Sequence, residues 1–152
     1  RREMLSHSAK VAAMLAAVGL LPQVASAQTA GFNTAAFAAK TMPEVMKALG
    51  AGTPTESKDV TITGPDIAEN GAGVPLGAAT ALPGVKRLLM LVEKNPSMLT
   101  AMFDVTDAIE ANISTRVKMG QSSDVYAVAM MNDGKVLFAR KEIKVTLGGC
   151  GG

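Results

Sequence analysis

A β-hairpin is encoded in the stretch VYAVAMMNDGKVLFAR, residues 125–140. In its first half the residues at positions 125, 127, 129 and 131 are apolar and face one way, as in a strand that buries one face. Asn132-Asp133-Gly134 is a strong hairpin turn. Residues Val136–Arg140 then return as a second strand. The stretch therefore predicts an antiparallel strand pair.

Further strand patterns lie on both sides of this hairpin. Residues 66–84 are rich in Gly, Ala and Pro and predict loops around a short edge strand near Val74–Leu76. Residues 98–105 fit a strand or a helix, and a strand is favoured. The remaining predicted strands are Val60–Ile62, a central strand Lys86–Glu93, Ile113–Met119 and a separate final strand Ile143–Leu147. Short strands at this spacing predict a mainly β fold, an immunoglobulin-like antiparallel β-sandwich.

A short helical segment precedes the strands. Asn33 can cap a helix over Thr34–Lys40. Thr41-Met42-Pro43-Glu44 is a capping-box pattern that starts a second helix, which runs to Leu49. Gly50 fits the position after its last turn. We expect this segment to pack on the domain rather than to bind a partner.

Residues 1–27 have the order of elements found in an export signal. Arg1 and Arg2 are followed by an apolar run over residues 11–21, which is too short to span a membrane. Small residues before Gln28 predict cleavage after Ala27. The paired arginines indicate the twin-arginine route into the periplasm. Residues 28–147 would then form the folded domain, which comprises the helical segment and the sandwich, and residues 148–152 would follow it as a terminal arm.

The charge balance argues against nucleic-acid binding. Three of the 15 basic residues and one of the 13 acidic residues lie in residues 1–27, which leaves a body without net charge. The only histidine, His7, also lies in that segment. The body would therefore lack histidine, which excludes Ser-His or Cys-His catalysis and His-containing metal sites.

The single cysteine, Cys150, stands near the end of the chain in Gly148-Gly149-Cys150-Gly151-Gly152. The four glycines predict a flexible arm. An ordinary cysteine thiol has a pKa of about 8.5, and the neighbouring residues offer no cation or helix start to lower it. A partner enzyme must therefore activate the thiol. Three residues from Leu147 span about 10 Å, and the exposed thiol predicts Cys150–Cys150 disulfide dimers in isolated protein.

The signal, the sandwich and the terminal run Val145-Thr146-Leu147-Gly148-Gly149-Cys150-Gly151-Gly152 together resemble the SoxY family, the sulfur-carrier subunits of the periplasmic thiosulfate-oxidising system. The resemblance implies covalent sulfur attachment at Cys150, no cofactor and no enzymatic activity of the carrier itself. It implies a heterodimer with a SoxZ-like subunit. Three enzymes would act on Cys150: a c-type cytochrome that conjugates thiosulfate, a dimanganese hydrolase that releases sulfate, and a sulfane dehydrogenase.

Other functions remain open on the residues alone. A ubiquitin-like thiocarboxylate carrier would use the terminal Gly151-Gly152, and a non-catalytic periplasmic interaction module would not need the arm. A lipid anchor is disfavoured because no cysteine follows Ala27. The apolar run Val85–Val92 and several methionines fit either core or a partner surface, and core is favoured for most of them (Met98, Met102, Met119, Met130 and Met131).

Overall fold

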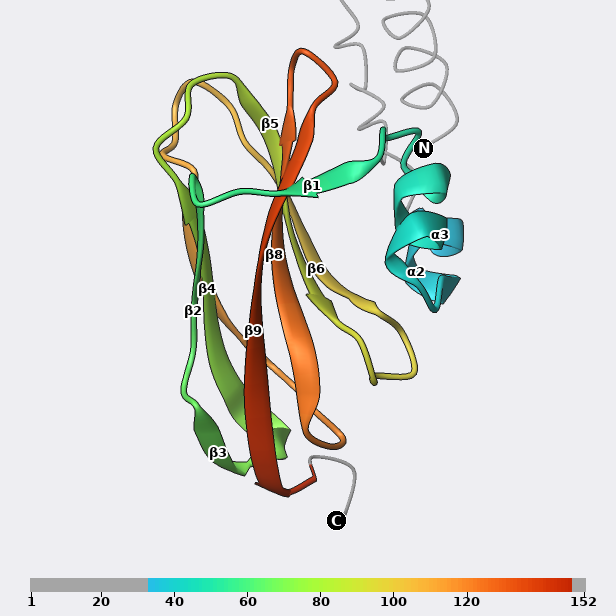
Figure 1. Cartoon of the computed structure of the whole chain (residues 1–152), viewed down its shortest axis with the longest axis vertical. Helices are drawn as coiled ribbons and strands as arrows, with labels where there is room; N and C mark the ends of the chain where they lie inside the picture. Colours follow the sequence, from blue (N-terminus) through green and yellow to red (C-terminus); the bar gives the residue numbers. More distant parts are fainter. Residues whose placement is uncertain (1–32, 149–152) are drawn as a thin grey trace, which may run out of the picture. The chain divides into compact units, whose positions relative to one another are not determined.

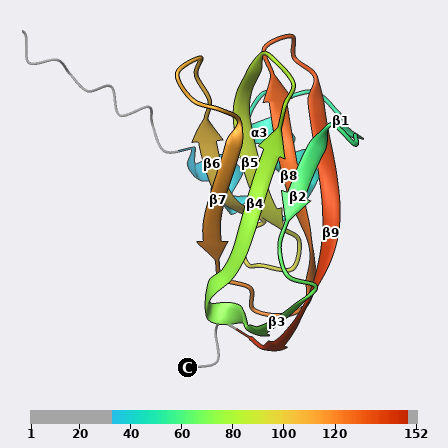
Figure 2. The same cartoon turned by 90° about the vertical axis from the view of Figure 1, so that its left-hand side faces the viewer.

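The computed structural model describes residues 33–148, which form a two-layer β-sandwich with two short helices on one side (Figure 1). The larger sheet has six strands in the order β1-β9-β8-β5-β6, and β3 pairs with a further part of β9. The smaller sheet has the order β2-β4-β7, and Figure 2 shows it from its outer side. The predicted sandwich is confirmed.

The elements in chain order have the following bounds: α2 Thr34–Ala38, α3 Met42–Ala48, β1 Pro54–Glu56, β2 Val60–Thr63, β3 Ile67–Asn70, a 3-10 turn Gly71–Gly73, β4 Val74–Thr80, β5 Val85–Val92, β6 Leu99–Asp104, β7 Asn112–Val117, β8 Ser123–Met131 and β9 Val136–Leu147.

The hairpin β8–β9 forms the middle of the larger sheet. Its antiparallel ladder runs from Ser123 opposite Ile143 to Met130 opposite Val136. Gly134, in the turn, has a φ of 89°, a conformation that side chains disfavour. On its other side β8 pairs with β5 along nearly the whole length of β5. The predicted hairpin and the predicted central strand are therefore both confirmed.

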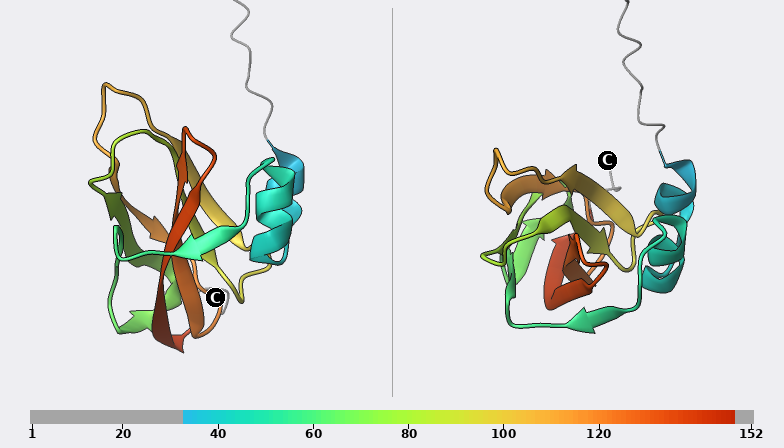
Figure 3. Two further views of the ribbon diagram at one scale, coloured as in Figure 1. Left: turned by 45° about the horizontal axis from the view of Figure 1, so that its top comes forward. Right: turned by 90° about the horizontal axis from the view of Figure 1, so that it is seen from above.

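Residues 88–92 of β5 are buried on both faces of the larger sheet, which explains why this part of the strand is continuously apolar. Leu88, Met90 and Val92 face the smaller sheet, while Leu89 and Leu91 face the helices. Figure 3 shows α2 and α3 as a separate layer beside the sheet. Their buried residues belong to the second core cluster (Ala36, Val45 and Met46). The helical segment packs on the domain, as expected.

The helix caps follow the sequence signals. The side chain of Asn33 accepts a hydrogen bond from the Ala36 amide, and Thr41 and Glu44 form the reciprocal capping box. Gly50, with a φ of 64°, follows the last turn. The first helix ends two residues earlier than predicted, because Ala39 is already extended and leads to the Thr41 cap.

The prediction of loops around a short edge strand in residues 66–84 was wrong. This part of the chain contains β3, and β4 is a seven-residue strand between β2 and β7. Pro75 is tolerated because β2 ends opposite Gly77, so the ladder on that side does not reach the proline. Gly77 lets the sheet close up, since a side chain there would lie 2.3 Å from Thr63 Oγ1.

The final strand is also longer than predicted. Residues 136–147 form one strand of 12 residues instead of two shorter ones. No Gly or Pro interrupts it at Lys141 and Glu142. Its outer edge carries two parallel pairings that the sequence did not predict, with β1 at one end and β3 at the other. The expectation that most methionines lie in the core holds for Met98, Met119 and Met130.

Candidate functional site

The predicted carrier residue Cys150 lies outside the described residues, as do Gly149, Gly151 and Gly152. The export-signal residues Arg1, Arg2 and Ala27 also lie outside them. Gly148 is the one arm residue that the structure places, directly after β9. The part of the candidate site that the structure describes is the base of the arm, where the chain leaves the sandwich (Figure 1).

One side of the arm base is held by β3. The parallel ladder between β3 and β9 reaches its end at Asn70 opposite Leu147. The Thr146 hydroxyl donates a hydrogen bond of 2.8 Å to the Glu69 carbonyl oxygen. These contacts continue to the last residue of β9, so the strand is held up to the point where the arm begins.

The other side is held by the connection between β7 and β8, where β9 extends past the end of β8. The Val145 amide donates to Ser122 Oγ at 2.9 Å, and the same hydroxyl lies 3.4 Å from the Val145 carbonyl oxygen. Gly148 then packs directly on the backbone of Gly120. The serine hydroxyl thus replaces the strand partner that β9 lacks beyond Ile143.

Asn95 fixes the shape of this connection. Its amide nitrogen donates to the Lys118 carbonyl oxygen at 2.7 Å, and its oxygen accepts from the Gly120 amide at 3.3 Å. Between those two residues, Met119 is fully buried and its amide donates to the Gly71 carbonyl oxygen at 2.8 Å. We call residues 118–120 the arm seat.

Sequence reasoning missed the arm seat. In the sequence, Asn95, Gly120 and Ser122 are polar or small residues between predicted strands and carry no specific signal. The contacts join residues more than 20 positions apart, from the β5–β6 connection, the β7–β8 connection and the end of β9. Only the pairing of the strands in space brings these residues together.

Two large apolar side chains are exposed at this end of the sandwich. Leu147, one residue before the arm, is 69% exposed, and Ile67 in β3 is 58% exposed. Isolated exposed apolar residues are common in folded proteins. Their position next to the arm base means that any protein which reaches the arm also meets apolar surface.

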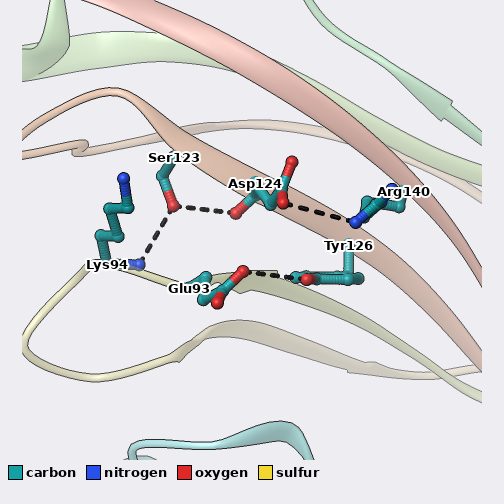
Figure 4. A network of polar contacts seen from close by, with 6 residues as sticks. All are labelled: Glu93, Lys94, Ser123, Asp124, Tyr126 and Arg140. Atoms are coloured by element: carbon teal, nitrogen blue, oxygen red, sulfur yellow. Dashed lines mark hydrogen bonds and ion pairs between the residues drawn. The ribbon is translucent and has the colours of Figure 1, made fainter.

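A polar network joins the end of β5 and the residues after it to β8 and β9 in the larger sheet (Figure 4). The Tyr126 hydroxyl donates to Glu93 Oε2 at 2.9 Å. Partial burial, with the hydrogen bond to Glu93, raises the pKa of Tyr126 to about 12. Asp124 faces Arg140 at 3.6 Å, and the buried Ser123 hydroxyl accepts from the Lys94 amide.

Lys141 in β9 joins the larger sheet to the connection between β2 and β3. Lys141 Nζ donates to the Gly64 carbonyl oxygen at 2.7 Å and lies 2.9 Å from Asp66 Oδ1. The hydrogen bond and the charge of Lys141 lower the pKa of the Asp66 carboxyl below its ordinary value. Lys141 thus fastens the link between β2 and β3, and β3 in turn supports the arm base.

A cavity of about 900 Å³ lies at the opposite end of the sandwich from the arm base. It is formed by the β4–β5 and β6–β7 connections and the start of β2, and its apolar lining includes Leu82, Val105 and Ile109. The Gly84 carbonyl oxygen, on one side of this cavity, accepts a hydrogen bond from the Asn132 amide in the β8–β9 turn, just before β9. The full length of β9 therefore separates it from Gly148, and it is not part of the arm site.

Within residues 33–148, no three His, Cys, Asp or Glu side chains gather closely enough to hold a metal ion. None of the helices in this part of the chain is long and apolar enough to cross a membrane.

Comparison with known proteins agrees with the fold. Residues 45–150 match the family model described as "Sulfur oxidation protein SoxY". The sulfur carrier protein SoxY from Chlorobium limicola f thiosulfatophilum has a similar structure, with a TM-score of 0.62 and 32% sequence identity, over 69% of this chain and 94% of that chain. No match was found among curated protein sequences.

A superoxide reductase (neelaredoxin) from Ignicoccus hospitalis also shares the sandwich, with a TM-score of 0.51 and 18% identity over 57% of this chain and 78% of that chain. Identity at that level indicates a common fold only. The match to the SoxY model spans most of the chain and extends to position 150, and the SoxY structure matches nearly throughout its own length. The chain therefore belongs to the SoxY family of sulfur oxidation proteins.

Proposed function

We propose that this protein carries thiosulfate-derived sulfur covalently on Cys150 and presents it to partner enzymes in the periplasm. The observation that carries the proposal is the SoxY family match, which runs through the sandwich and includes position 150. The structure of the arm base supports it, since β9 is held on both sides up to its last residue and delivers the arm from a rigid strand.

The chemistry that fits a carrier thiol begins with an oxidation. The thiol and thiosulfate join through a new sulfur–sulfur bond, the thiol loses its proton, and two electrons pass to a c-type cytochrome enzyme. Water then attacks the terminal sulfone, which leaves as sulfate, and the second sulfur stays on Cys150 as a persulfide. A dimanganese hydrolase would perform this step, and a sulfane dehydrogenase would oxidise the remaining sulfur on the carrier.

In this scheme the carrier supplies attachment and the partners supply catalysis. A thiol next to glycines has no built-in activation, so each enzyme must provide the cation or base that makes the thiolate. A SoxZ-like subunit would complete the carrier as a heterodimer. Residues 1–27 would direct export by the twin-arginine route, with cleavage after Ala27, and the carrier itself would not be an enzyme.

The thiocarboxylate alternative is not supported by the fold. Carriers of that kind are β-grasp proteins, whereas this chain is a two-layer sandwich of the SoxY family. The interaction-module alternative is separated by experiment. Purified protein is incubated with thiosulfate, the cognate cytochrome enzyme and an electron acceptor, and the intact mass is measured.

A mass increase of two sulfur and three oxygen atoms that maps to Cys150 is expected. The Cys150→Ala variant should show no increase, although it should unfold at the same temperature as the wild type. A carrier that works equally well after that substitution would contradict the proposal.

A further inference from the structure

Gly148 is packed more tightly than a flexible linker requires. A methyl group on its Cα would lie 2.3 Å from the Gly120 carbonyl oxygen and 3.2 Å from the carbonyl carbon. Ordinary contacts between such atoms lie at roughly 3.5 Å or beyond. The blocking atoms belong to the backbone, so no side-chain rotation can relieve the contact.

The arm seat is not free to move away. Asn95 holds the Lys118 carbonyl and the Gly120 amide together, and the buried Met119 side chain lies between them. The Met119 amide is bonded to Gly71, which precedes β4. A side chain at position 148 would therefore have to displace the arm rather than the seat.

We propose that Gly148 is a positioning residue for carrier function, because its contact with the arm seat fixes the direction in which the chain leaves β9. This proposal rests on the proposed function, in which partner enzymes act on Cys150. The glycine at position 148 then serves close packing, which differs from the freedom of motion that the sequence alone indicated.

The contact also shortens the reach of the carrier thiol. Only two residues lead from Gly148 to Cys150, so a fully extended chain can place the Cα atom of Cys150 at most about 7 Å from the Cα atom of Gly148. An enzyme that acts on Cys150 must therefore come close to the end of the sandwich formed by the seat and β3. Leu147, which is 69% exposed, lies within that footprint.

Four variants of the full chain test the proposal: Gly148→Ala, Asn95→Ala, the double variant with both changes, and Gly73→Ala. Gly73 is the matched control. It lies in the 3-10 turn between β3 and β4, and the atom nearest to an added methyl group would be Arg116 Nη1 at 3.9 Å.

The first readout is the distance between two spin labels, one attached to Cys150 and the other attached to a cysteine introduced by Lys135→Cys. The 12 residues of β9 lie between position 135 and Gly148 and extend over about 40 Å.

The second readout is kcat/KM of the cytochrome enzyme with the carrier as substrate. Gly148→Ala should shift the mean label distance and lower kcat/KM by roughly ten- to a hundredfold, as expected when a reacting group is misplaced. Gly73→Ala should change neither value. Asn95→Ala releases the seat, so the double variant should return both values toward the wild type.

A Gly148→Ala protein with the wild-type label distance, or with the wild-type kcat/KM, would overturn the proposal. Additive effects of Gly148→Ala and Asn95→Ala would also overturn it, because a methyl that only limits chain freedom does not depend on the seat. If the wild-type protein forms no thiosulfate adduct, the proposed function fails on its own, while the label distances still decide whether Gly148 sets the exit direction.

Discussion

Replacement of Ser122 by alanine should loosen the end of β9 specifically. The Ser122 hydroxyl accepts the Val145 amide hydrogen bond at 2.9 Å, at a point where β8 no longer pairs with β9. Alanine removes this acceptor and leaves the amide without its partner. The opposite edge of β9 keeps its pairing with β3, so the strand should stay in the sheet.

The size of the effect follows from the burial of the amide. A buried donor without a partner costs about 1–3 kcal/mol. Val145 is half-buried, and water can reach part of the site, which places the expected loss near 1 kcal/mol. A free-energy change of that size corresponds to roughly fivefold in the local opening equilibrium. The melting temperature should fall by about 4 °C.

Amide hydrogen exchange measured by NMR provides the assay. The Val145 amide should exchange roughly fivefold faster or more in Ser122→Ala than in the wild type. Ser57→Ala is the control, because the Ser57 hydroxyl also accepts a hydrogen bond from a backbone amide, that of Asp59 at 3.1 Å, but at an exposed position in the β1–β2 connection. An unchanged Val145 rate in Ser122→Ala, or an equal change in Ser57→Ala, would refute the role assigned to Ser122.

Three further outcomes test the fold and its electrostatics. Leu88→Ala should lower the free energy of unfolding by about 2–5 kcal/mol, because Leu88 is fully buried between the sheets, whereas a large loss from the exposed control Leu147→Ala would contradict this account. The only tyrosine, Tyr126, should ionise near pH 12 in an absorbance titration, and Glu93→Gln should lower that midpoint. Because the pKa of Tyr126 is higher in the folded state, its contribution to the free energy of unfolding is fully present below pH 10. That contribution is lost as the pH rises from 10 to 12. The pKa of Asp66 is lowered in the folded state, so its contribution to the free energy of unfolding is present at neutral pH and is lost in acid. The difference in stability between the wild type and Asp66→Asn should therefore shrink as the pH falls through the pKa of Asp66 in the folded state.

The sequence predicts the parts of this fold that rest on local patterns. The hairpin at residues 125–140 combines strand alternation with a specific turn, and the Thr41 capping box is complete within four residues. The apolar run Leu88–Val92 in β5 identifies a central strand because both faces of this run are buried. Each of these features can be recognised without knowledge of the rest of the chain.

The missed features depend on contacts between distant segments. β1 and β3 have three and four residues, and both exist as parallel partners of β9 rather than through their own patterns. β4 looked like loop because it contains Pro75 and Gly77. The proline lies beyond the end of β2, and the glycine permits close approach to Thr63.

The arm shows the same limit at the candidate site. A terminal cysteine between glycines indicates a carrier thiol, which stays a prediction for Cys150. The sequence does not distinguish a glycine that serves flexibility from one that serves close packing. Gly148 and Gly149 look equivalent in sequence, yet Gly148 packs on Gly120, which lies 28 residues earlier in the chain.

The central claim is that sulfur from thiosulfate becomes attached to Cys150. Its most direct test is the intact mass of the protein after reaction with thiosulfate, an electron acceptor and the cognate cytochrome enzyme, followed by peptide mapping. The account predicts a thiosulfate-dependent adduct on Cys150 that a reductant removes. An unmodified Cys150 in a mixture that actively consumes thiosulfate would contradict it.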